Sequence, residues 1–146
     1  MYQRILVPVD GSALSDRAID ASIGLARQLG AAITGFVAEQ PPPARERRRA
    51  GSGLRLIEDL DSLTPEAARH VLDRFAAAAR AAGVPFEGHH ARVEQVDVAL
   101  LAEAEARGCD LIVMVSEGRG AFGEFLYGSQ AKAVLSGSKL PLLVLH

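Results

Sequence analysis

Short apolar segments alternate with segments of helical periodicity along most of the chain. Strands are expected at residues 5–9, 31–37, 85–93, 111–115 and 141–145. Continuous apolar runs of this length are typical of strands that are buried on both faces of a sheet. Strict alternation of strands and helices requires right-handed crossovers and parallel strands. The pattern therefore predicts a three-layer α/β/α sandwich with a five-stranded parallel sheet.

Several helix boundaries are marked by local sequence signals. Thr64-Pro65-Glu66 predicts a helix start, because it combines an N-cap, a proline in the first turn and an acid near the positive end of the helix dipole. Gly83 is expected to end that helix. Asp97 is expected to cap the next helix. Its apolar face is predicted to comprise Val98, Leu101 and Ala104.

Residues 39–61 interrupt the alternation. They contain Pro41-Pro42-Pro43 and the basic run Arg45–Arg49 without a regular period. We expect a long, mobile excursion from a single domain that spans residues 1–146. The basic run is interpreted as a solvated loop, and the alternatives are a contact with phosphates or with an acidic partner.

Composition excludes several classes of function. The formal net charge is −2 and aromatic residues make up 5% of the chain, so a nucleic-acid interface is not expected. The apolar runs are far shorter than the ~20 residues of a membrane span. The single cysteine, Cys109, is interpreted as a small core residue of a cytoplasmic protein. His89 and His90 are adjacent on an expected strand and point to opposite faces, so no metal site is predicted.

Two strand ends carry polar or glycine-rich turns. Asp10 follows the first strand, and the fourth strand runs into a glycine-rich loop that ends at Ser129. Ser129 is expected to cap a helix, whose free amides would form an anion site. The loop has neither the P-loop nor the dinucleotide-binding pattern. If the first and fourth strands are neighbours, both turns face one crevice at the carboxyl end of the sheet.

The chain resembles the universal stress protein family over nearly its whole length, apart from residues 39–61. The similarity rests on the opening strand and turn through Ser12, on residues 110–114, and on the segment from Gly128-Ser129 to Leu145. This family shares the fold class of the adenine nucleotide alpha hydrolases. Its nucleotide-binding members carry a glycine, two residues, a second glycine, nine residues and then Gly-Ser or Gly-Thr. In this chain Gly118 and Gly128-Ser129 match the second part of that motif.

The resemblance implies a site for ATP or AMP, with or without Mg²⁺. Asp10 and Val37 would flank the adenine and ribose, whereas Gly118, Gly128 and Ser129 would hold the phosphates. The first motif glycine is replaced by Val115, and Glu117 adds a negative charge to the loop. Both departures favour the alternative of a nucleotide-free interaction module with the same fold.

The leading hypothesis is a homodimeric stress-response regulator that binds an adenine nucleotide and has no catalytic residues. The apolar segment Leu140–Leu145 would be a hazardous exposed edge if it is the last strand, and by resemblance it pairs with a second subunit. The alternative is a central strand covered within one chain. A slow ATP hydrolase is a further alternative, in which Asp10 would hold the metal. The sequence leaves open which nucleotide, which stress and which partner are involved.

Overall fold

A computed structural model describes residues 1–11, 13–39, 64–115 and 134–145 of the chain. Within these residues the chain forms five strands and three labelled helices, and residues 134–137 are also helical. The elements in chain order are β1 (Arg4–Pro8), α1 (Ala13–Leu29), β2 (Ala32–Glu39), α4 (Pro65–Ala81), β3 (Phe86–Arg92), α5 (Val96–Ala106), β4 (Leu111–Val115) and β5 (Leu142–Leu145).

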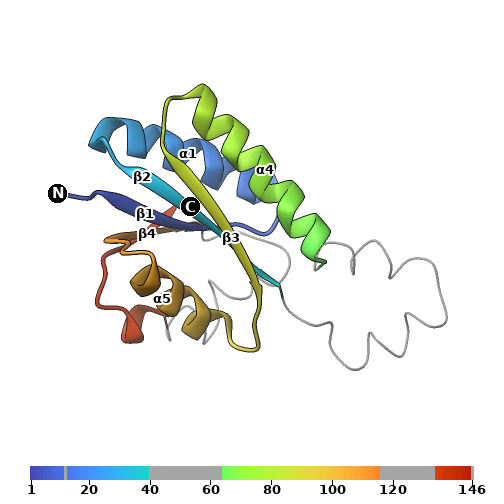
Figure 1. The fold of residues 1–146 in the computed structure, drawn as a ribbon. Helices are drawn as coiled ribbons and strands as arrows, with labels where there is room; N and C mark the ends of the chain where they lie inside the picture. The colour runs from blue at the N-terminus through green and yellow to red at the C-terminus, as the bar shows by residue number, and fades with distance from the viewer. Residues whose placement is uncertain (12, 40–63, 116–133, 146) are drawn as a thin grey trace.

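The five strands form one parallel sheet with the order β3-β2-β1-β4-β5. The predicted fold class is therefore confirmed. Helices α1 and α4 lie together on one face of the sheet, and α5 lies on the other (Figure 1). β2 continues to Glu39, so the strand includes the first residue of the expected excursion. The remainder of that excursion and the run Arg45–Arg49 lie outside the described residues.

One hydrophobic core lies on each face of the sheet, because successive side chains along a strand point to opposite faces. The core under α1 and α4 contains Ile5, Val7, Ile33 and Phe75, each fully buried. The core under α5 comprises Leu6, Phe36, Ala38, Val96, Leu100, Ala104, Cys109, Ile112, Met114 and Val134. Cys109 is 6% exposed, which confirms its interpretation as a core residue.

The start of α4 is confirmed, whereas two expectations for α5 are wrong. The Thr64 hydroxyl accepts a hydrogen bond from the Ala67 amide and caps α4, as predicted. Helix α5 instead begins at Val96, with Gln95 as an N-cap that makes no side-chain hydrogen bond, so Asp97 lies inside the first turn. Val98 is 54% exposed, and the buried face consists of Val96, Leu100 and Ala104. Leucine and alanine surround this helix on most sides, so periodicity alone does not select the face that packs on the sheet.

Asp110 joins the beginnings of β1 and β4. One carboxylate oxygen accepts the amide hydrogen of Gln3 at 2.8 Å, and the other accepts that of Arg4 at 3.0 Å. The Asp110 amide donates in turn to the Arg4 carbonyl at 2.9 Å. This exchange closes the amino-terminal end of the β1–β4 pair and fixes the register in which Ile5 lies beside Leu111.

Gly35 of β2 lies beneath a pair of aromatic rings. The rings of Phe75 and Phe86 are 4.7 Å apart at their centroids and are inclined by 52°. A Cβ atom built on Gly35 would be 2.8 Å from the Phe86 ring. The missing side chain therefore lets both rings approach the strand backbone and fill the space between β2, β3 and α4.

The two edges of the sheet differ in character. β3 is an edge strand with charged and histidine side chains, as its polar sequence predicted. β5 is the opposite edge of the sheet that the described residues form, so the alternative of a central strand is wrong for this part of the chain. Leu143 of β5 is 39% exposed, and the other three residues of the strand are partly exposed.

Candidate nucleotide site at the carboxyl end of the sheet

The order of the strands reverses between β1 and β4. From β1 the chain proceeds to β2 and β3 on one side, and it then crosses to β4 and β5 on the other. The pairing of Ile5 with Leu111 confirms that β1 and β4 are neighbours. In open α/β sheets ligands bind at such a reversal, outside the carboxyl ends of the strands. β1 and β4 therefore lie side by side at this reversal.

The turn after β1 is held by the backbone and by a glycine. The Val9 amide donates to the Phe36 carbonyl at 2.9 Å, and this bond fixes the chain just before the half-buried Asp10. Gly11 has a φ of 83°, and a Cβ there would lie 2.9 Å from Cγ2 of Val71 in α4. Only glycine fits this conformation and this close contact without strain. The Val9–Phe36 hydrogen bond and Gly11 thus fix the position of Asp10 just beyond the end of β1.

The remaining predicted site residues fall into two groups. Val37 is 3% exposed, and its side chain lies in the core under α1 and α4. Gly118, Gly128 and Ser129 lie outside the described residues, as does Glu117. Val115 is the last residue of β4 and pairs with Leu145 in register. The structure thus places Val37 on β2 and Asp10 in the turn that follows the neighbouring strand, β1.

A buried carboxylate next to a histidine is a feature of this end of the sheet that sequence reasoning missed. Glu39 ends β2 with a side chain that is 7% exposed, and its Oε1 atom contacts Nδ1 of His90 on β3. The His90 side chain is 28% exposed. An acidic residue that ends an apolar strand was the available signal, but only the β2–β3 register shows that a histidine lies beside it.

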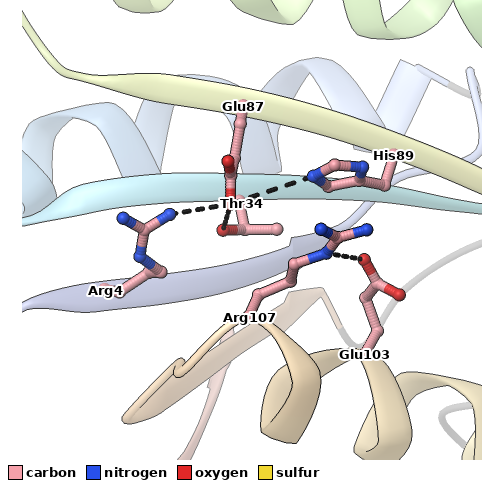
Figure 2. Close-up of polar contacts among 6 residues, drawn as sticks. All are labelled: Arg4, Thr34, Glu87, His89, Glu103 and Arg107. Atoms are coloured by element: carbon pink, nitrogen blue, oxygen red, sulfur yellow. Dashed lines mark hydrogen bonds and ion pairs between the residues drawn. The ribbon is translucent and has the colours of Figure 1, made fainter.

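A second polar cluster lies on the α5 face of the sheet and extends from Arg4, the first residue of β1, to His89 on β3 (Figure 2). Glu87 of β3 accepts a hydrogen bond from Arg4 Nη1 at 2.8 Å, and the Thr34 hydroxyl donates to the same oxygen at 3.5 Å. Nε2 of His89 lies 3.8 Å from that oxygen and is buried without a hydrogen-bond partner in the described structure. His89 and His90 thus lie on opposite faces of β3, as predicted, and each also faces a carboxylate that was not predicted.

Two ionisable groups beside this cluster have shifted pKa values. The hydrogen bond of Arg107 Nε to Glu103, at 2.9 Å, raises the pKa of the guanidinium group. Burial raises the pKa of the Cys109 thiol, and the neighbouring Thr34 hydroxyl opposes that shift. Both shifts stabilise the protonated form, which each group already has at neutral pH. Neither residue is therefore prepared for acid–base or nucleophilic chemistry.

Neither a metal-binding cluster nor a membrane-spanning helix occurs among the described residues. No group of three or more histidine, cysteine, aspartate or glutamate side chains is arranged to hold a metal ion there. None of the helices in the described ranges combines the length and apolarity that a membrane crossing needs.

Comparisons with known proteins agree with the topology. Residues 1–146 match the sequence profile of the universal stress protein family. A universal stress protein of Methanocaldococcus jannaschii is 28% identical over 99% of this chain and 82% of its own length. A solved structure of a family member from Burkholderia pseudomallei is 27% identical, with a TM-score of 0.72 and coverage of 99% of this chain and 96% of that one. A universal stress protein solved in complex with cAMP is 25% identical, with a TM-score of 0.68 and coverage of 99% and 97%. The chain belongs to the universal stress protein family.

Proposed function

We propose that the chain binds an adenine nucleotide, ATP or AMP, in the crevice between the turns that follow β1 and β4. The observation that carries the proposal is the reversal of strand order between these two strands, with the half-buried Asp10 at its rim. A related universal stress protein was solved in complex with cAMP, an adenine nucleotide. Gly118, Gly128 and Ser129 supply the expected phosphate contacts, and Asp10 and Val37 flank the base and ribose.

The proposed role is regulatory binding rather than turnover. The described residues include no cluster that could hold a catalytic metal, and a P-loop lysine is missing from the glycine-rich loop. A hydrolase would instead show magnesium-dependent phosphate release that Asp10→Ala abolishes. A turnover assay with ATP and Mg²⁺ separates the two activities, and regulatory binding predicts equal phosphate release from the wild type and Asp10→Ala.

Isothermal titration of the nucleotide-stripped protein with ATP and AMP, with and without Mg²⁺, tests the binding. We expect micromolar affinity in the wild type and its loss in the double variant Gly118→Val, Ser129→Ala. Ser136→Ala changes an exposed serine in the helical stretch 134–137 and serves as the matched control. Absence of heat and of thermal stabilisation at millimolar nucleotide would refute the proposal and favour the nucleotide-free interaction module, which Val115 and Glu117 support.

We further propose that β5 mediates homodimerisation. β5 has a single hydrogen-bonded neighbour in the described sheet, and its apolar side chains are partly exposed. A second copy would pair with this edge and cover Leu143. Sedimentation should show a dimer in the wild type and a shift toward monomer in Leu143→Lys. A monomeric wild type at micromolar concentration would contradict this assignment.

A further inference from the structure

Helix α4 contacts the segment after β1 at two points on one side of the helix. A Cβ atom built on Gly11 would lie 2.9 Å from Cγ2 of Val71, so the backbone of Gly11 packs directly against this valine. Three residues further along α4, Nη2 of Arg74 donates a hydrogen bond to the carboxylate of Asp16. Residues three positions apart lie on the same side of a helix. A single face of α4 therefore contacts both the turn after β1 and the first turn of α1.

These two contacts enclose the segment that carries Asp10. Asp10 is half-buried and directly precedes Gly11, and Asp16 lies in the first turn of α1. Val71 is itself packed against the core under α1 and α4. Because Gly11 has no side chain and a φ of 83°, its backbone follows the surface that Val71 presents. A displacement of α4 would therefore move the backbone of Gly11 and, with it, Asp10.

We propose that α4 positions the turn after β1 for nucleotide binding, with Val71 and Arg74 as the positioning residues. This inference rests on the proposed function, in which Asp10 flanks the bound nucleotide. Neither Val71 nor Arg74 belongs to the proposed set of nucleotide contacts, so each acts through the turn. A binding group must be held within about 0.5 Å of its productive position by packing and by supporting contacts.

The ion pair distinguishes positioning from long-range electrostatics. Arg74 and Asp16 have side chains that are 48% and 57% exposed, and ion pairs at such surfaces contribute little to stability. A purely electrostatic effect on an anionic nucleotide has opposite signs in the two single variants, because Arg74→Ala removes a positive charge and Asp16→Ala removes a negative one. Loss of the positioning contact instead weakens binding in both variants.

The packing contact provides a second, independent test. Gly11→Ala places a methyl group against Cγ2 of Val71 and forces an L side chain into a strained conformation. Val71→Ala removes Cγ2 and leaves room for that methyl group. The affinity lost on Gly11→Ala should therefore be smaller in the Val71→Ala background than in the wild type.

Two residues provide matched controls. Val84 is 6% exposed in the same core as Val71, but it precedes β3 and so lies at the amino end of the sheet. Val84→Ala makes the same truncation away from the turn. Arg80 is an exposed arginine in the last turn of α4, and Arg80→Ala removes the same charge from the same helix. Both control variants should bind AMP with the affinity of the wild type.

The experiment is a calorimetric titration of the full-length wild type and of each variant with AMP. We expect Arg74→Ala and Asp16→Ala each to weaken AMP binding about threefold, whereas Arg74→Lys keeps the ion pair and most of the affinity. Val71→Ala should weaken binding about threefold and Gly11→Ala about tenfold. Thermal unfolding of each variant verifies that it folds. If Gly11→Ala does not fold, the two ion-pair variants, which change exposed side chains, decide the test.

Opposite changes in AMP affinity for Arg74→Ala and Asp16→Ala would reveal an electrostatic effect and overturn the inference. Unchanged affinity in both Val71→Ala and Arg74→Ala would overturn it too, as would an equal loss in Val71→Ala and Val84→Ala. In each of these cases the wild type binds AMP, so the proposed function stands. A wild type that binds no AMP refutes the proposed function together with this inference.

Discussion

Two glycine-to-alanine substitutions are predicted to change stability in opposite directions. A methyl group on Gly35 of β2 would lie 2.8 Å from Cζ of Phe86 and 3.0 Å from Cδ1 of Phe75. Phe75 is fully buried, so its ring has no free volume into which it can retreat. A methyl group on Gly24, in the interior of α1, would meet no atom within 4 Å. The same chemical change therefore tests packing at one site and backbone entropy at the other.

The magnitudes follow from these environments. Overpacking a dense core costs about 1–3 kcal/mol, and replacing a glycine in a strand recovers about 0.5–1 kcal/mol of backbone entropy. Gly35→Ala should therefore lower the free energy of unfolding by about 1–2 kcal/mol. Gly24→Ala should raise it by about 0.5–1 kcal/mol, the difference in helix propensity. For a chain of this size each kcal/mol shifts Tm by about 2–4 °C.

Urea unfolding monitored by circular dichroism measures both changes. The double variant Gly35→Ala, Phe86→Leu should recover part of the lost stability, because leucine removes the ring atoms closest to the new methyl group. The coupling between the two sites should therefore be favourable. A Gly35→Ala variant as stable as the wild type, with an unchanged m-value, would refute the close packing of these rings against β2.

Three further predictions concern single polar groups. Asp110→Ala removes the acceptor for the amides of Gln3 and Arg4, the second of which is half-buried, and should lower the free energy of unfolding in urea by about 2 kcal/mol; a loss below about 0.5 kcal/mol would contradict this role. Thr64→Ala removes the cap on the Ala67 amide and should cost about 1 kcal/mol in the same assay, with unchanged stability as the refuting result. Burial raises the pKa of the Cys109 thiol in the folded chain above the ordinary value of 9.0. Above about pH 9 the unfolded chain therefore loses the thiol proton while the folded chain keeps it, and the free energy of unfolding should fall as pH rises. Urea unfolding of the wild type and Cys109→Ala between pH 8 and 10 measures the contribution of the thiol, and parallel pH curves would count against it.

Short-range patterns in the sequence were sufficient to predict the layers of this fold. A buried parallel strand needs an unbroken apolar run, and such runs mark β1 and β4 without reference to the rest of the chain. The cap at Thr64 depends on residues that are adjacent in sequence, and it was predicted for the same reason. The burial of α5 depends on which of its apolar sides faces the sheet, and the sequence does not distinguish them, so Val98 was assigned to the wrong face.

The candidate site was predictable only where it depends on topology. From the sequence, the adjacency of β1 and β4 was stated as a condition for a shared crevice, and the strand order meets that condition. The contact of Glu39 with His90 depends on the register of β2 against β3, across 51 residues of chain. The hydrogen bond from the Gln3 amide to the Asp110 carboxylate spans 107 residues and has no local sequence signature. Long-range registers of this kind are set by the whole packed sheet rather than by any one segment.

A crystal structure of the full-length protein grown with AMP tests the central claim most directly. We expect one nucleotide per chain at the carboxyl ends of β1 and β4, with its phosphate beside Ser129 and its base flanked by Asp10 and Val37. A nucleotide bound at the opposite end of the sheet, beside Arg4 and Glu87, would contradict the account. A nucleotide site left empty at saturating AMP would contradict it equally.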